Sequence, residues 1–254
     1  VFFLPFLKDV FNSQLELTSE HIKLYIENLS IIYKNNDEVL KLLKKFKFKD
    51  TTKFGCLKKF EVDNKEYSVH YLDMAHRVDI LSETFDFKEI KSFFEIGGGF
   101  GSNIHILLTN FPNIKKIIYL DIVPNIYVGT QYLKLFYGDA VKDYLVTKNL
   151  SKISFAQDNN LEIFCLPPWQ IEKLDVDIDH FHNAASFVEM PKKIISNYCK
   201  FIDKFNTKEI SLISYDKHDP ETTFNPELLS DFFKKKLNIR WENTLIKDYK
   251  RKLI

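Results

Sequence analysis

A glycine-rich stretch between a predicted strand and a predicted helix constrains the fold of this chain more than any other feature. Residues 93–96 read FFEI, a short and mainly apolar run that is typical of a buried parallel strand. Residues 97–101 then read GGGFG. Apolar residues recur at i, i+3, i+4 and i+7 from Ile104 to Phe111, which predicts a helix with one apolar stripe. A turn of this kind brings backbone N–H groups and a helix N-terminus up to a ligand.

The spacing of the glycines distinguishes between two kinds of ligand. In the dinucleotide fingerprint G-x-G-x-x-G, a diphosphate sits on the helix N-terminus. Gly97 and Gly99 fit this fingerprint, but its last position holds Ser102, and the third glycine comes early, at Gly101. The acid before the turn, Glu95, would repel a diphosphate but suits a cationic ligand.

A second acid completes the pattern. The second predicted strand, residues 116–120, ends in Asp121, at the spacing where an acid binds ribose hydroxyls. Together these residues resemble the cofactor site of the class I S-adenosylmethionine (SAM) methyltransferases. The resemblance assigns cofactor binding to Glu95, Gly97, Gly98, Gly99, Gly101 and Asp121. It implies SAM as the cofactor, S-adenosyl-L-homocysteine as the product, and a Rossmann-like α/β fold. The alternative interpretation is a glycine-rich loop in an unrelated α/β protein.

The remaining pattern after residue 93 alternates between strand and helix, which predicts a mostly parallel sheet with helices on both faces. Further strands are predicted at 116–121, 161–165, 178–183, 209–215, 239–246 and 249–254, and helices at 126–136, 191–205 and 226–236. We therefore expect a SAM-binding domain over residues 89–254.

Residues 1–88 are predicted to form a mainly helical N-terminal cap. Thr18–Glu20 and Asn36–Glu38 can each begin a helix. Residues 53–69 predict a hairpin with Asp63–Asn64 at its turn.

A further helix, predicted at residues 71–81, carries Tyr71, His76 and Arg77. These side chains are either exposed surface residues or substrate contacts, since a fold of this kind needs a lid to exclude water.

Two more stretches narrow the resemblance. Residues 121–138 and 177–191, with EIGGGFG, resemble a bacterial group of sugar O-methyltransferases over roughly residues 90–200. In the segment around the fourth predicted strand, the matching residues are Asp177, Asp179, Asn183, Ala185, Ser186, Phe187, Glu189 and Met190. His182 stands where that group is expected to have an aliphatic residue. The resemblance implies a sugar, nucleotide sugar or surface polysaccharide as the methyl acceptor.

A sugar hydroxyl is a weak nucleophile, so its methylation needs a base or a metal. Glu189 could reach the acceptor, or it could bind backbone N–H groups at the helix start before Pro191. His218, after the fifth predicted strand, is either a general base or an exposed loop histidine. We name Glu189 and His218 as the catalytic candidates.

Other candidates follow the strands, because ligands of open α/β sheets lie at the carboxyl ends of the strands. Asn183 is placed to contact cofactor or acceptor, and Ser186 either bonds the substrate or caps a turn. Leu166, in the segment 166–169, is predicted to flank the adenine; the alternative packs Trp169 into the core.

The acids do not predict a metal site. Asp175, Asp177 and Asp179 precede the carboxyl end of their strand, which favours a structural role. A magnesium-dependent variant stays open through Asp216, His218 and Asp219.

Composition limits the partners and the location. Lys+Arg (36) nearly balance Asp+Glu (35), so we expect no nucleic-acid partner. Three isolated cysteines without C-x-x-C spacing fit a reducing cytoplasm. We expect no membrane span. The start, VFFLPFL, is a poor signal peptide, and the absence of an initial Met leaves room for a preceding segment.

Three other functions stay open on sequence alone. They are methylation of another small molecule, a nicotinamide-dependent oxidoreductase, which Ser102 disfavours, and a non-catalytic SAM-binding subunit. The particular sugar, its hydroxyl and the oligomeric state are not determined by the sequence.

Overall fold

The computed structural model describes residues 27, 30, 31, 33–54, 58–215, 224–233, 240–243 and 250–253. The chain divides into two compact units, residues 1–75 and 76–254. The boundary falls within helix α4 (Val69–Leu81), which corresponds to the helix predicted at 71–81. The functional division after residue 88 stays a prediction.

The first unit contains a helix that begins where the sequence indicates. The side chain of Asn36 accepts hydrogen bonds from the N–H groups of Glu38 and Val39, and α3 (Asp37–Lys45) follows. Two of the four orphan donors of the helix start are thereby satisfied. The helix predicted to begin at Thr18–Glu20 lies largely outside the described residues.

The predicted hairpin is also present in the first unit. Strands β1 (Lys59–Val62) and β2 (Lys65–Ser68) pair antiparallel. Asp63 and Asn64 both have positive φ, 50° and 59°, as a two-residue type I′ turn requires. Asn and Asp tolerate this backbone conformation better than other non-glycine residues.

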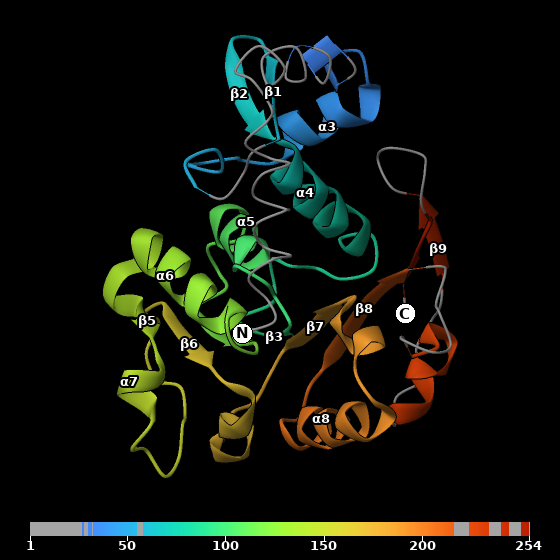
Figure 1. Cartoon of the computed structure of the whole chain (residues 1–254). Coiled ribbons are helices and arrows are strands. Elements are labelled where there is room, and N and C mark those ends of the chain that lie inside the picture. Colours follow the sequence, from blue (N-terminus) through green and yellow to red (C-terminus); the bar gives the residue numbers. More distant parts are fainter. Residues whose placement is uncertain are drawn as a thin grey trace, which may run out of the picture. The chain divides into compact units, whose positions relative to one another are not determined.

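The second unit is built on one mostly parallel sheet (Figure 1). In the described residues its order is β5-β6-β4-β3-β7-β8-β10-β9. The strands are β3 (Ser92–Ile96), β4 (Lys116–Leu120), β5 (Val141–Lys142), β6 (Glu162–Leu166), β7 (His180–Ala184), β8 (Glu209–Tyr215), β9 (Arg240–Asn243) and β10 (Lys250–Leu253). The six strands β5, β6, β4, β3, β7 and β8 are parallel to one another, whereas β10 runs antiparallel to both β8 and β9. The Rossmann-like fold class is confirmed, although β10 interrupts the 3-2-1-4-5-6 order of dinucleotide-binding sheets.

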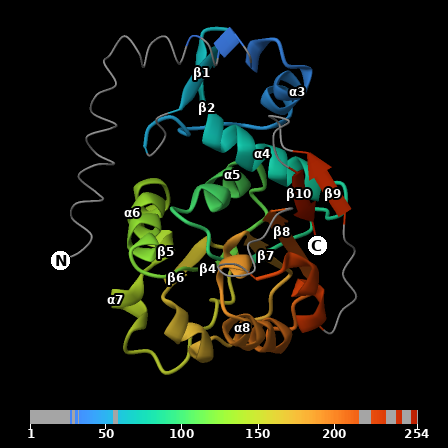
Figure 2. The same ribbon diagram turned by 45° about the vertical axis from the view of Figure 1, so that its right-hand side comes forward.

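The strand order explains why helices cover both faces of the sheet. Succession from β3 to β4 and β6 runs one way across the sheet, and succession from β7 to β8 runs the other way. Right-handed crossovers then place α5 (Ser102–Asn110) and α6 (Asn125–Tyr137) on one face and α8 (Lys192–Lys204) on the other. Figures 1 and 2 show this arrangement.

The two faces of the sheet differ in polarity. On the α8 face, Phe94, Phe181 and Leu212 belong to one apolar core with Ile195 and Ile202 of α8. The opposite face carries a buried polar row, whose members are Tyr119, Glu95, His182 and Ser211. These four residues share a face because parallel pairing sets them side by side.

Helix α5 departs from the predicted single apolar stripe, because Asn103 and His105 are buried as well as Ile104. Their polar atoms have partners: Asn103 donates to Glu95, and His105 Nδ1 lies 2.6 Å from the hydroxyl of Tyr132. Apolar periodicity cannot reveal polar side chains whose burial is offset by hydrogen bonds.

The other elements confirm the predicted succession, with two differences. The predicted helix at 226–236 is a 3₁₀ helix, η4 (Pro226–Phe232), in the described residues. The two-residue strand β5 and the short helix α7 (Tyr144–Thr147) were not predicted. Both elements are too short to carry a periodic pattern.

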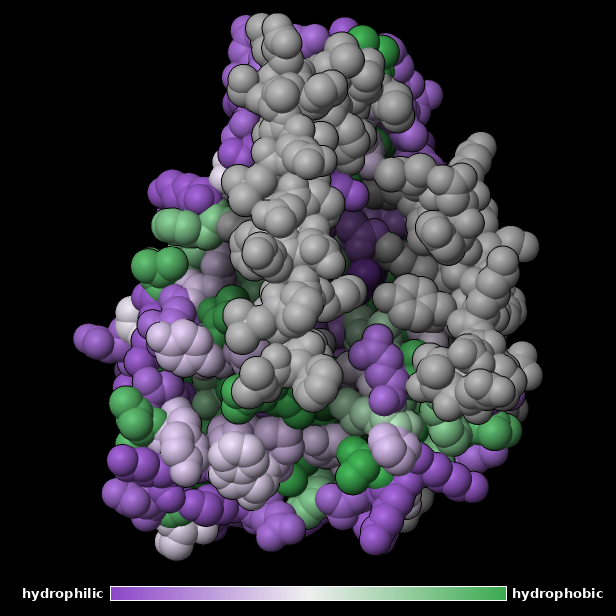
Figure 3. Space-filling model, viewed as in Figure 1, coloured by the Kyte–Doolittle hydropathy of each residue, from purple (hydrophilic) through white to green (hydrophobic). Residues whose placement is uncertain are grey.

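The described surface is mixed in character. In the second unit, hydrophilic side chains gather along the lower rim in Figure 3, near α7 and α8, with hydrophobic residues between them. No helix in the described part of the chain combines the length and apolar character needed to cross a membrane.

Candidate functional site

The glycine turn after β3 has the backbone geometry that its residues allow. Gly97, Gly99 and Gly101 have φ of 76°, 61° and 86°, in the left-handed region that favours glycine. A Cβ at Gly97 would overlap the side chain of Ser186. A Cβ at Gly99 would meet no atom within 4 Å, so open space lies against this part of the turn. The turn therefore offers bare backbone to a ligand.

Asp121 holds this turn in place. Its carboxylate accepts a hydrogen bond from the N–H of Gly99 at 2.9 Å and another from the N–H of Ile122 at 2.7 Å. Burial raises the pKa of Asp121, and these backbone hydrogen bonds oppose that rise. A carboxylate has about four lone-pair sites, so Asp121 keeps capacity to accept further hydrogen bonds.

Glu95 lies beneath the same turn and is only 2% exposed. Asn103 donates to its Oε1 at 2.9 Å, while Oε2 has no hydrogen-bond partner among the described residues. A Cβ at Gly98 would lie 2.6 Å from Oε2, so a side chain there would require the carboxyl of Glu95 to move. Burial raises the pKa of Glu95 to about 7; Asn103 opposes this, nearby Asp121 adds to it, and Arg77 opposes it. The protein thus buries an acid with one unused oxygen.

A cavity of about 320 Å³ opens beside the turn, at the carboxyl ends of β3, β4 and β7. Its size falls in the range of small-molecule sites. Its lining residues are Ile96, Gly97, Leu120, Asp121, Ile122, Asn125, Ala184, Ala185, Ser186, Glu189, Met190 and Tyr198. The predicted residues Gly97, Asp121, Ser186 and Glu189 are therefore brought together on one wall.

Asn183 and Ser186 act together as a link between strands. Asn183 Nδ2 donates to the carbonyl of Ile96 at 2.8 Å and to Ser186 Oγ at 2.6 Å, and Ser186 Oγ also lies 3.2 Å from that carbonyl. Asn183 Oδ1 accepts from the N–H of Phe187 at 3.1 Å. These bonds tie the end of β7 to the end of β3 and shape the cavity wall. Direct contact of either residue with a ligand stays a prediction.

Glu189 ends the 3₁₀ helix η3 (Ser186–Glu189) and is exposed on the cavity wall. No hydrogen bond from a described backbone N–H reaches its carboxylate, so the helix-start role is not observed, and contact with an acceptor stays a prediction. Ala185 places η3 by adopting a φ of 67°, an uncommon value for alanine. Ala185 is among the residues of the sequence resemblance, but nothing local indicates its left-handed backbone.

The residues after β6 divide between core and surface. Leu166 is buried in the core on the α8 face, and its carbonyl accepts from the N–H of Asp121 at 3.3 Å. Trp169 is 61% exposed and lies against Tyr144, so the alternative that packed Trp169 into the core is wrong. An adenine contact in this segment stays a prediction.

The remaining candidates are only partly described. Tyr71, in the first unit, is fully buried, which excludes exposed surface decoration for this residue. His76 and Arg77, in the second unit, are half-buried. His218, and with it Asp216 and Asp219, lies outside the described residues.

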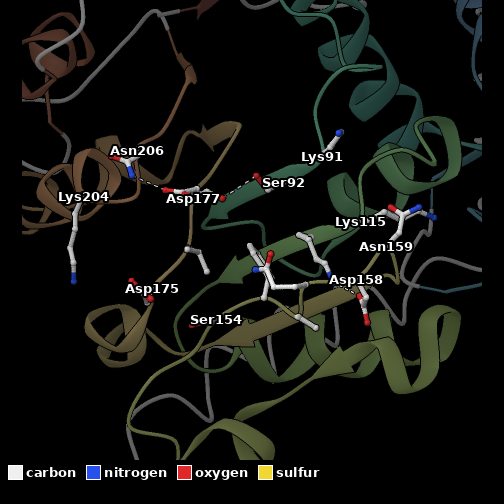
Figure 4. A pocket seen from close by; sticks show the side chains of 15 residues that line it. Lys91, Ser92, Lys115, Ser154, Asp158, Asn159, Asp175, Asp177, Lys204 and Asn206 are labelled. Atoms are coloured by element: carbon white, nitrogen blue, oxygen red, sulfur yellow. Dashed lines mark hydrogen bonds and ion pairs between the residues drawn. The ribbon is translucent and has the colours of Figure 1, made fainter.

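A larger cavity, of about 830 Å³, lies at the opposite, amino-terminal edge of the sheet (Figure 4). Its charged side chains already have partners in several places: Lys116 pairs with Asp158, and Asn206 bonds Asp177. It lies at the amino-terminal ends of β3 and β4, away from the glycine turn. We therefore assign the site to the smaller cavity.

The three aspartates near β7 have structural partners. Asp179 accepts from the N–H groups of Lys91 and Ser92, Asp177 accepts from Asn206, and Asp175 pairs with Lys152. The described residues contain no group of three or more His, Cys, Asp or Glu side chains that could hold a metal.

Comparisons with known proteins find likeness only among solved structures. No protein-family model and no curated protein matches the chain. One similar structure is mitomycin 7-O-methyltransferase, at 11% identity and a TM-score of 0.46, over 72% of this chain and 56% of that one. Another is magnesium protoporphyrin IX methyltransferase from a Synechocystis strain with S-adenosylhomocysteine bound, at 12% identity and 0.46, over 72% and 81%. A third is a SAM-dependent methyltransferase from Aquifex aeolicus, at 16% identity and 0.39, over 69% and 86%. This chain thus spans little more than half of the first of these proteins, and likeness of this degree supports no conclusion about its substrate.

Proposed function

We propose that this protein is a SAM-dependent methyltransferase. The observation that carries the proposal is the open glycine turn, which is held by Asp121 and lies over the buried carboxyl of Glu95. Gly97 of this turn and Asp121 line a cavity of about 320 Å³. A neutral or anionic ligand would leave Glu95 without a compensating charge, whereas a cationic cofactor supplies one.

The residues of the turn and the wall fit this cofactor. Asp121 has free lone pairs for ribose hydroxyls, and the unhindered backbone at Gly99 permits close approach. When bound, the cofactor supplies an electrophilic methyl group on a sulfonium with a good leaving group. The chain then has to exclude water, orient the acceptor and remove one proton from it.

Glu189 is our candidate for the proton acceptor. It lies on the same cavity wall as Gly97 and Asp121, and its carboxylate is exposed to an incoming hydroxyl. His218 is retained as the second candidate base. A divalent metal that lowers the pKa of the hydroxyl would be the alternative to either.

For the acceptor we propose a hydroxyl of a sugar, nucleotide sugar or glycan. The support is the sequence resemblance over residues 90–200 and the polar character of the predicted acceptor residues. His76, Arg77 and Ser186 offer imidazole, guanidinium and hydroxyl groups, a mixture that suits a polyhydroxylated ligand.

The test is transfer of a radiolabelled methyl group from SAM to a panel of nucleotide sugars and surface-glycan fragments. Labelling of a sugar hydroxyl supports the proposal in full. Labelling of another small molecule would retain the enzyme class and reject the sugar. SAM binding with no transfer to any class of acceptor would favour the non-catalytic subunit.

A further inference from the structure

Four polar side chains on the α5 side of the sheet form a chain that the proposed site does not use. Glu209 Oε2 lies 3.3 Å from His180 Nδ1, and His180 Nε2 lies 2.7 Å from Ser211 Oγ. Ser211 Oγ in turn lies 2.8 Å from His182 Nδ1. The side chain of Glu209 is 40% exposed, whereas the other three residues are buried. This series of hydrogen bonds therefore runs from solvent at the start of β8 into the buried face.

The chemistry of these groups fixes the direction of each hydrogen bond. A carboxylate can only accept, so His180 donates to Glu209 through Nδ1–H. Burial lowers the pKa of His180, so the ring is neutral. Its Nε2 accepts from the hydroxyl of Ser211 at 2.7 Å, in preference to the carbonyl of Phe181, which lies 3.5 Å from the same hydroxyl. Ser211 Oγ then accepts from His182 Nδ1–H. Burial, then His180 and Arg77, lower the pKa of His182 to about 3, so this ring is neutral too and its Nε2 carries a lone pair.

The end of this chain lies close to the proposed site. His182 on β7 pairs in register with Glu95 on β3, and the charge of Arg77 acts on both. Ala184, two residues further along the same face of β7, lines the cavity. No hydrogen bond to His182 Nε2 is recorded among the residues that the structure describes.

Apolar side chains would fill this face at a lower desolvation cost, as Ile117 and Ile163 do on β4 and β6. The hydrogen bonds along this polar set instead determine which nitrogen of His182 carries the proton. Nε2 of His182 is then a hydrogen-bond acceptor, because the ring proton is held at Nδ1.

We propose that His182 binds the substrate through Nε2, which accepts a hydrogen bond from the hydroxyl to be methylated. Glu209, His180 and Ser211 are positioning residues that fix its tautomer. This role rests on the proposed methyltransferase function. A neutral acceptor at this point orients the hydroxyl, while Glu189 or His218 takes the proton.

The tautomer can be measured by long-range ¹H–¹⁵N NMR on the full chain labelled at histidine, with His182→Gln to assign the signal. We expect a proton on Nδ1 and none on Nε2 of His182 at neutral pH. Ser211→Ala should lose this preference. Ser214→Ala is the matched control, because Ser214 is a buried serine of the same strand whose hydroxyl has no partner among the described residues. A proton on Nε2, or a tautomer unaffected by Ser211→Ala, would overturn the proposal.

Access to Nε2 separates a substrate contact from a core histidine. Diethyl pyrocarbonate acylates unprotonated imidazole nitrogens that it can reach, and peptide mass spectrometry locates the product. We expect acylation of His182 in the folded protein and protection of His180, whose two nitrogens are both hydrogen-bonded. Protection of His182 until the chain is unfolded would make it a core residue and end the proposal.

SAM binding to the same sample, measured by calorimetry, tests the proposed function separately. Acylation of His182 together with SAM binding supports both the methyltransferase function and the proposed role of His182. Acylation without SAM binding would reject the methyltransferase and the hydroxyl-binding role together, and would leave only the tautomer established.

Discussion

The N–H of Gly99 donates to Oδ2 of Asp121 at 2.9 Å, so the glycine turn after β3 and the acid after β4 form one unit. The hydroxyl of Tyr119 also donates to the carbonyl of Gly99 from below. The residue most open to a ligand is thus fixed on both sides of its own backbone. Such fixing lowers the entropy that a ligand would have to remove on binding.

Asp121→Ala should weaken cofactor binding by about 2 kcal/mol, some thirtyfold. The substitution removes the predicted ribose acceptor and leaves the N–H groups of Gly99 and Ile122 without their partner. Calorimetric titration with SAM measures the effect. Asp158→Ala, at the opposite edge of the sheet, is the control and should bind normally. Unchanged affinity in folded Asp121→Ala would remove this residue from the site.

Gly99→Val should abolish cofactor binding in a folded protein. The residue has a φ of 61°, and its Cβ would enter the open space where the ligand is proposed to lie. Gly138→Val is a matched control, since Gly138 also has positive φ and open space around it but follows α6, away from the glycine turn. Both variants should lose stability, by about 1–3 kcal/mol each. Only Gly99→Val should lose cofactor binding. Equal cofactor affinity of the two variants would show that the glycine turn does not contact the ligand.

The pKa of Glu95 predicts how stability depends on pH in the ligand-free protein. Burial raises this pKa from 4.5 to about 7, so the folded state holds a proton that the unfolded state releases. The associated stability is fully present below pH 4.5 and is lost as the pH rises through about 7. The loss totals about 3 kcal/mol.

Glu95→Gln keeps an acceptor for Asn103 but cannot ionise. Its stability relative to the wild type should therefore increase between pH 5 and pH 8. Urea denaturation at several pH values measures this difference. A difference that stays constant with pH would show that Glu95 does not titrate in this range.

Glu189→Gln should lower turnover by about a hundredfold or more and leave SAM affinity unchanged, if Glu189 is the base. The amide keeps the size of the side chain on the cavity wall but cannot take a proton. Methyl transfer to the acceptor found by screening provides the rate. Full activity of the variant would shift the assignment to His218, to a metal or to a residue of the cap.

Much of the fold could be predicted because its signals are local. The strand at 209–215 has the predicted bounds, and the Asp63–Asn64 turn is where its residues place it. The place of Asp121 beside the glycine turn could be predicted from its spacing in the sequence. These features depend on the period of a strand, on turn chemistry and on the length of one strand–helix unit.

The rest depends on contacts between distant segments. Tyr198 of α8 lines the cavity, although it follows Asp121 by more than seventy residues and has no motif of its own. The burial of Asn103 follows from Glu95 on the neighbouring strand. The histidines of β7 carry no local functional signal, because the contact between His182 and Ser211 joins residues of two different strands.

The most direct test of the central claim is calorimetric titration of the unmodified protein with SAM, S-adenosylhomocysteine and NAD. The buried Glu95 carboxyl, the open turn at Gly99 and the free lone pairs of Asp121 predict binding of the first two and none of NAD. Tighter binding of NAD than of S-adenosylhomocysteine would contradict the methyltransferase assignment.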